Sequence, residues 1–249
     1  MVVTPPNNSM QLTALRAAAG AGRYADRATV TWYAHEVIAA GSQKVARVVA
    51  GDPMLAPFAY RLHGPLEHAW HRPDVAHGLP ETGLVVVRPV CDLAGDEAEW
   101  YGEPVLDWES LRATDTSSPL DPAAVAQACG VNDAFLPPES FLSFLQALAT
   151  RADATLLFYS CSMWGGDIES EYAFILGRSP SAIVALPQDR DEDGCPRVVV
   201  IEGGRKTPAT RDVLSIALSA LDFQIPTPFF APHTRAFRWQ SYRLGREPA

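Results

Sequence analysis

The chain has 249 residues, a formal net charge of −9 and a sequence pI near 5.1. This acidic balance argues against a nucleic-acid-binding protein, because such a protein needs a basic surface to displace counterions; it suits a basic partner instead. Hydrophobic residues make up 47% of the chain and charged residues 20%, which predicts a globular protein with a real core. No run approaches the roughly 18 apolar residues of a transmembrane helix, so no membrane partner is expected.

The cysteine pattern indicates the compartment and argues against a metal or redox site. None of the four cysteines stands at the short spacing of a zinc ribbon or a CxxC redox motif, and Cys161 is predicted to be a buried, inert thiol. The N-terminus lacks the charged and apolar regions of a secretory signal. We therefore expect a cytoplasmic protein with no cofactor and no bound metal.

The domain organisation is predicted to be simple. Residues 1–27 combine prolines and asparagines with an Ala/Gly-rich run and are expected to form a flexible tail. Residues 28–249 are expected to form one α+β domain. A polar stretch at 114–120 is the alternative junction between two subdomains.

The N-terminal half alternates β-prone and proline-rich segments. Residues 28–38 predict a strand, residues 44–50 a strand or a helix, and residues 83–93 a buried strand. Between them, the histidine-rich loop 63–77 places His68 and His71 one turn apart if a short helix forms there. Either half of a metal site or ordinary loop histidines would fit this pattern.

Two helices are predicted before the centre of the chain. Asp121 is a natural N-cap, Pro122 suits the first helical position, and Gly130 can follow the end in the left-handed conformation. The next helix should begin near Pro138. Its apolar stripe consists of Phe141, Phe144, Leu145 and Leu148.

Two β-prone runs flank a glycine pair at Gly165 and Gly166, which predicts a hairpin. Counting back from that turn pairs Trp164 with Asp167, Ser162 with Glu169, and Ser160 with Glu171. One face would then carry the core residues Leu157, Tyr159, Cys161, Met163, Ile168, Ser170, Tyr172, Phe174 and Leu176. The opposite face would present the two acids beside the two serines.

Glu169 and Glu171 would lie about 7 Å apart on that polar face. Such a pair can serve general acid/base chemistry or one side of a metal site. It can also be an ordinary solvated patch, or a docking patch for arginine, because carboxylates accept bidentate guanidinium bonds.

Residues 181–186 and 197–202 predict two further strands, joined by the acidic loop 189–194. That loop begins like a calcium loop, but Val200 stands where the pattern requires a bidentate glutamate. The glycines after Glu202 lead to Arg205, Lys206 and Thr207, with a helix expected to start at Thr207. A helix N-terminus with two cations predicts a weak anion-binding site.

The last aromatic and basic segment, 229–244, is expected to close over the core, with its arginines reaching acidic neighbours. The whole pattern predicts an α+β fold: a mainly antiparallel sheet with helices packed on one side.

The acidic balance and the WGGDIESE hairpin together resemble, in general character, the bacterial immunity proteins of polymorphic toxin systems. The resemblance implies a non-enzymatic cytoplasmic protein that neutralises one cognate toxin, here a basic protein. The expected contact residues are Ser160, Ser162, Trp164, Asp167, Glu169 and Glu171. The alternative is a metal-dependent hydrolase that uses Glu169 and Glu171 with His71 or His233.

Overall fold

The computed structural model describes residues 32–40, 43–63, 83–87, 111, 118–133, 136–164, 167–192, 194–221 and 242–244. For residues 32–40, 162–164 and 167–168 it describes the backbone alone. The predictions for the tail 1–27, for His68 and His71, and for the segment 229–241 lie outside the described residues.

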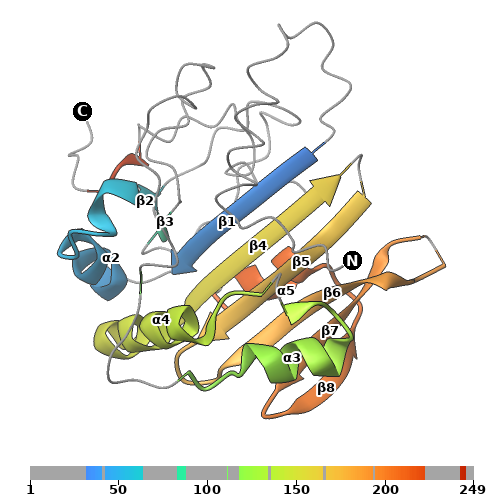
Figure 1. Ribbon diagram of the computed structural model, residues 1–249. Helices are drawn as coiled ribbons and strands as arrows, with labels where there is room; N and C mark the ends of the chain where they lie inside the picture. The colour runs from blue at the N-terminus through green and yellow to red at the C-terminus, as the bar shows by residue number, and fades with distance from the viewer. Residues whose placement is uncertain are drawn as a thin grey trace, which may run out of the picture.

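One antiparallel sheet forms the centre of the molecule (Figure 1). In the described residues its strands are β1 (Trp32–Ala40), β2 (Ala59–Leu62), β3 (Leu84–Val87), β4 (Leu156–Trp164), β5 (Asp167–Leu176), β6 (Ser181–Arg190), β7 (Pro196–Glu202) and β8 (Arg205–Ala209). Their order is β2-β3-β1-β4-β5-β6-β7-β8, and each neighbouring pair is antiparallel. From β4 onward the chain forms a meander of hairpins.

Helices cover both faces of this sheet. They are α2 (Gln43–Ala50), α3 (Pro122–Cys129), α4 (Glu139–Ala152) and α5 (Val213–Ser219), with a short 3-10 turn, η1, at Ala56–Phe58. The α+β class with an antiparallel sheet is confirmed. The one-sided arrangement holds for α2, α3 and α4, whereas α5 packs against the opposite face (Figure 1).

The ends of α3 follow the sequence signals closely. The Asp121 carboxylate accepts a hydrogen bond from the Ala123 amide at 2.9 Å, and Pro122 occupies the first turn. Gly130 ends the helix with φ 68°, a left-handed conformation that glycine adopts without steric cost. Both predicted boundaries are confirmed.

The first apolar layer lies between α4 and the sheet. Phe141, Leu145 and Leu148 are buried, as the predicted stripe requires, and the Phe141 ring meets the Phe158 ring edge-on at 5.0 Å. The sheet residues in this layer are Val85, Val87, Leu156, Phe158, Tyr172, Phe174, Leu176, Ala182, Val184, Leu186, Val199 and Ile201. Residues 44–50 also contribute to this layer, as the helix α2, through Val45 and Val49.

The second apolar layer lies between α5 and the other face of the sheet. The helix buries Val213, Leu214, Ala217 and Leu218. Their partners on the sheet include Leu157, Tyr159, Cys161, Ala173, Ile175, Ile183, Ala185 and Val198. The strands are therefore apolar on both faces, which explains why their sequences are nearly continuous apolar runs.

Polar contacts fix α4 against the turn between β5 and β6. The Gln146 side chain accepts a hydrogen bond from the Gly177 amide at 3.0 Å. Gly177 has φ 126°, and a Cβ there would lie 2.9 Å from the Ala154 carbonyl oxygen, so this turn requires glycine.

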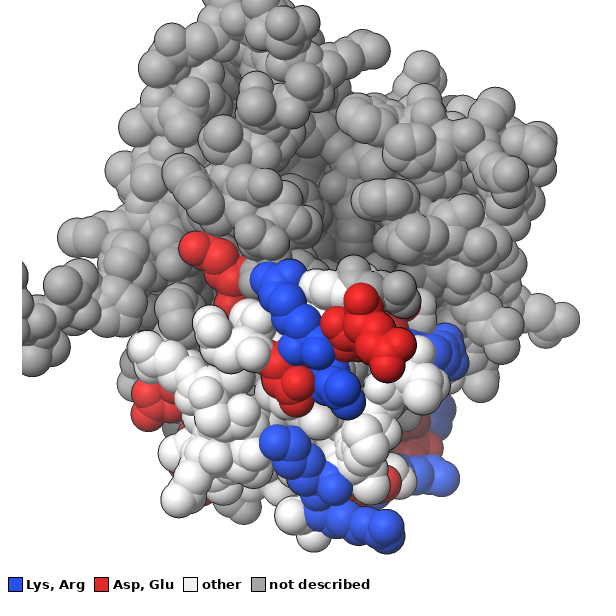
Figure 2. All heavy atoms as spheres, turned by 90° about the vertical axis from the view of Figure 1, so that its right-hand side faces the viewer, with Lys and Arg blue, Asp and Glu red and all other residues white. Residues whose placement is uncertain are grey.

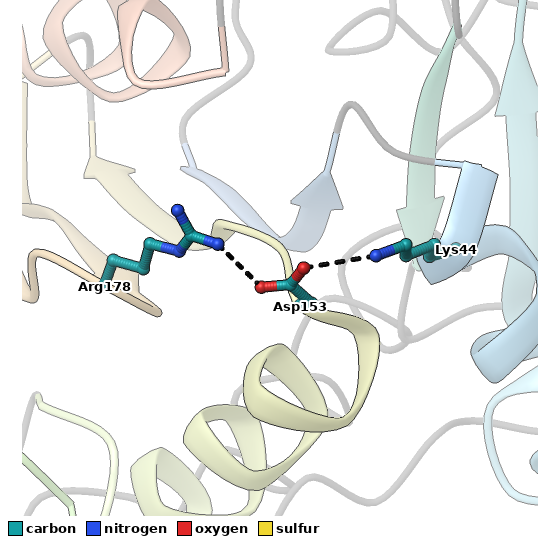
Figure 3. A network of polar contacts seen from close by, with 3 residues as sticks. All are labelled: Lys44, Asp153 and Arg178. Atoms are coloured by element: carbon teal, nitrogen blue, oxygen red, sulfur yellow. Dashed lines mark hydrogen bonds and ion pairs between the residues drawn. The ribbon is translucent and has the colours of Figure 1, made fainter.

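The residue that ends α4, Asp153, joins three elements (Figure 3). Its carboxylate receives Arg178 at 3.0 Å from the β5–β6 turn and Lys44 at 3.1 Å from α2. The hydrogen bond from Arg178, followed by that from Lys44, lowers the pKa of Asp153. All three side chains are exposed, so the network positions these elements more than it stabilises them.

We expect Phe141→Ala to destabilise the protein by about 3 to 5 kcal/mol, because it leaves a cavity beside Phe158. Urea unfolding followed by circular dichroism measures this change. The matched control is Phe144→Ala on the same helix, where the side chain is only partly buried, and its cost should be clearly smaller. Equal costs for the two variants would contradict the described placement of α4.

Candidate functional site

The β4–β5 hairpin contains a β-bulge that changes its register. Trp164 lies opposite Asp167 and Met163 opposite Ile168, as a two-residue turn requires. Between Met163 and Ser162 the register shifts, so that Ser162 lies opposite Ser170 and leaves Glu169 as the extra residue. From there on, every pair differs by one residue from the sequence-based count.

This shift corrects the predicted faces of the hairpin. Cys161 lies opposite Glu171, and Ser160 opposite Tyr172, so the predicted pairs of Ser160 with Glu171 and of Ser162 with Glu169 are wrong. The single core face is wrong as well, because Tyr159 and Cys161 belong to the α5 layer whereas Tyr172 belongs to the α4 layer. A one-residue slip moves a whole strand to the other face.

The predicted contact residues fall into different environments. Glu169 is exposed, whereas Glu171 is half-buried and Ser160 is 7% exposed. Ser160 therefore does not belong to an open contact surface, which corrects the prediction for that residue. For Ser162, Trp164 and Asp167 only the backbone is described, and their side chains lie outside the described residues.

The carboxyl group of Glu171 lies in the α5 layer and accepts a hydrogen bond from the Tyr159 hydroxyl at 3.0 Å. Burial raises the pKa of Glu171 to about 7, and the negative charge of Asp212 acts in the same direction, while the Tyr159 hydrogen bond lowers it. In the described part of the chain, neither group that acts on this carboxyl is a cation. An acid in such surroundings changes charge near neutral pH.

The thiol of Cys161 lies beside this acid and is buried. Burial raises the pKa of Cys161 to about 12, and the neighbouring charge of Glu171 contributes to the rise. Because the thiolate is the reactive form, Cys161 is a structural thiol and not a nucleophile. The buried position predicted for it is confirmed.

Asp212, the N-cap of α5, is the residue of this cluster that the sequence analysis missed. Its carboxylate accepts hydrogen bonds from the Ser215 amide at 2.8 Å and from the Ser215 hydroxyl at 2.7 Å. An aspartate directly before an apolar run is an N-cap signal, whereas the sequence pattern around Thr207 predicts a helix start five residues too early.

The predicted anion site does not have the geometry it needs. Residues 205–209 form β8, which pairs with β7, so no helix begins at Thr207. The Thr207 hydroxyl donates to the Val200 carbonyl, and the Lys206 ammonium donates to the Ala128 carbonyl at 2.9 Å, near the end of α3. Lys206 therefore lies at the C-terminal end of α3, where cations are favoured. The prediction that Arg205, Lys206 and Thr207 form an anion site at a helix N-terminus is wrong, because no helix begins there.

The acidic loop between β6 and β7 is a hairpin turn with local bonds. The Asp191 carboxylate accepts the Cys195 amide at 2.8 Å, and Asp189 pairs with Arg197 at 3.1 Å. Figure 2 shows that acidic and basic side chains are interspersed over the described part of this side of the molecule. The acidic excess of the chain is not gathered into one patch there.

Near β2, the described end of the closing segment contacts the sheet. The Leu244 amide donates to the Ala59 carbonyl at 2.9 Å, and the Tyr242 ring meets the His63 ring edge-on at 5.7 Å. Arg243 donates to the Pro57 carbonyl at 2.9 Å. At these three residues the chain returns to the sheet, and Arg243 caps a carbonyl where an acidic neighbour was expected.

Within the described ranges, no group of three histidine, cysteine, aspartate or glutamate side chains is arranged to hold a metal ion. No helix in those ranges is long and apolar enough to cross a bilayer. Comparisons with protein-family models, with curated proteins and with solved structures return no match for this chain. Its function must therefore be argued from the geometry of its own residues.

The raised pKa of Glu171 predicts a pH-dependent stability with a definite sign. The folded state holds the proton up to about pH 7, whereas the unfolded state releases it near 4.5. The contribution of Glu171 is therefore fully present below 4.5 and is lost as pH rises to about 7, by an amount on the order of 3 kcal/mol.

Urea unfolding of the natural protein and of Glu171→Gln at several pH values tests this effect. The difference in unfolding free energy between them should change steadily from about pH 4.5 to about pH 7 and level off above that, in favour of the variant at the alkaline end. A difference that is constant across this range would contradict the placement of Glu171 in the α5 layer.

Proposed function

We propose that the protein is a non-enzymatic binding protein whose β4–β5 hairpin engages a basic protein partner. The observation that carries this proposal is the β-bulge, which removes Glu169 from the strand ladder and leaves it exposed on the hairpin. An exposed carboxylate on an irregular strand is an acceptor that an arginine or lysine of a partner can reach. Bulges commonly re-aim a side chain where a strand serves a function.

Two further features support a basic partner. The formal net charge of −9 favours electrostatic attraction of a cationic protein. The next acid along the strand, Glu171, has Tyr159 and Asp212 as its electrostatic neighbours among the described residues, and neither of them is a cation. In this proposal Glu169 is the first point of contact, and Glu171, which is half-buried, is the second acid.

The same bulge weakens the hydrolase alternative. Two catalytic carboxylates must converge on one substrate position, and their roles require a shared pocket. Here Glu169 is exposed, whereas Glu171 is half-buried and bonded to Tyr159. Regular alternation was the only reason to bring the two carboxylates together, and the bulge interrupts it.

Within this proposal, the partner is a toxin domain that the protein neutralises in the cytoplasm. The support is the acidic balance together with the WGGDIESE hairpin, which have the general character of immunity proteins. Neutralisation would follow from occlusion, because a bound protein of ordinary interface size covers about 800 Å² of its partner's surface.

The binding proposal is tested by charge reversal at one hairpin. The tagged protein is purified from its native host beside Glu169→Lys and the matched control Glu202→Lys, which reverses an exposed acid at the turn between β7 and β8. We expect a basic protein to be retained by the natural protein and the control. Retention by Glu169→Lys should fall on the order of tenfold, because an attractive charge pair becomes repulsive.

The purified partner then allows a direct measurement. Titration calorimetry of the two proteins should show affinity that weakens with added salt, as an exposed charge pair requires. Equal affinity for the natural protein and Glu169→Lys would overturn the role of the hairpin. Toxicity of the expressed partner that is relieved by the natural protein would identify it as a toxin, and harmless expression would reject that part of the proposal.

A further inference from the structure

The cluster between α5 and the sheet contains an ionisable acid in an otherwise apolar layer. Val213, Leu214, Ala217 and Leu218 of α5 are buried there, together with Tyr159 and Cys161 of the sheet. Glu171 lies opposite Cys161 and bonds to the Tyr159 hydroxyl, so its carboxyl lies in the same layer. A charge in this position is costly unless polar neighbours stabilise it or an adjacent element moves away and admits water.

Helix α5 is held on the sheet by apolar packing. Every hydrogen bond that its side chains make in the described residues stays within residues 211–219: Arg211 donates to the Ser215 carbonyl and the Ser219 hydroxyl, and Asp212 accepts from Ser215. The helix is seven residues long. A short element without polar ties to its support is a local opening unit.

Among the side chains that the structure describes, the charged groups around Glu171 do not offset its ionised form. Asp212, at the start of α5, is acidic and is fixed in place by its capping bonds. Arg211 is occupied by α5 itself. On the strands, Tyr159 and Cys161 are neutral groups, β6 has no ionisable residue from Ser181 to Leu186, and β1 places His35 opposite Cys161 in the register.

We propose that ionisation of Glu171 releases α5 from the sheet, so that α5 acts as a pH-controlled cover over the Tyr159–Glu171 pair. With the proton in place, the carboxyl is a neutral hydrogen-bonding partner of Tyr159 beneath an apolar helix. Without it, a charge lies in the apolar layer and faces the charge of Asp212, and opening of α5 admits water to both. This cover works whether or not the hairpin binds a partner.

Amide hydrogen exchange on the full chain tests this device. After correction for intrinsic rates, the amides of Ile216, Ala220 and Leu221 should exchange through an opening that is easier than the one that exposes the β5–β6 ladder at Phe174. The opening equilibrium of α5 should rise about tenfold between about pH 6 and about pH 8, the range in which the closed form loses the proton of Glu171.

Matched variants separate the source of the pH dependence. Glu171→Gln keeps the size of the side chain and should remove the rise, whereas Glu169→Gln removes the same charge from an exposed position and should leave it unchanged. Asp212→Asn retains an N-cap residue and should reduce the rise. His35→Asn removes the histidine that the register places opposite Cys161 and should leave the rise unchanged.

Three results would overturn the proposal. The first is a rise that persists in Glu171→Gln, and the second is a rise that disappears in His35→Asn alone. The third is exchange of the α5 amides with the same free energy of opening as the Phe174 amide at every pH, since α5 would then have no opening of its own. Should Glu171→Gln fail to fold, the comparison of Asp212→Asn with the natural protein decides the same question.

Discussion

The register of the β4–β5 hairpin is the constraint on which the rest of the structure depends. These two strands lie in the middle of the sheet, and both of their faces are covered. A shift in the register of such a strand would move its residues from one covered face to the other. The register therefore decides which residues pack against α4 and which against α5. The bulge at Glu169 fits the glycine turn to this pairing, because it inserts one residue near the turn and leaves the remaining ladder intact.

The position of Glu171 follows from that adjustment. Without the bulge, the residue would lie opposite Ser160, on the face that α4 covers. With it, the acid lies opposite Cys161 and within reach of the Tyr159 hydroxyl. Its raised pKa is thus a consequence of register, since the same residue one position away on the ladder would have had different neighbours on the other face.

Much of the fold could be predicted from local signals. The caps of α3, the apolar stripe of α4 and the strands β6 and β7 depend on contacts within a few residues, and the sequence displays them directly. The predictions that failed depended on tertiary context. The predicted pairing of Ser160 with Glu171 is wrong because a β-bulge shifts the register. The predicted helix start at Thr207 is wrong because this segment pairs with β7 as the edge strand β8.

In the candidate site, too, the sequence predicts which residues are present but not how the tertiary structure separates them. Glu169 and Glu171 were selected as a pair because regular alternation makes residues two apart equivalent. The bulge places them in different environments: Glu169 is exposed, whereas Glu171 is half-buried and bonded to Tyr159. The two roles proposed above, binding at the surface and response to pH beneath a helix, therefore rest on separate residues. Glu171 lies in an apolar layer with no cation among its described electrostatic neighbours, and ionisation there is costly; this cost is the reason why α5, the shortest α-helix in the described residues, is the element proposed to move.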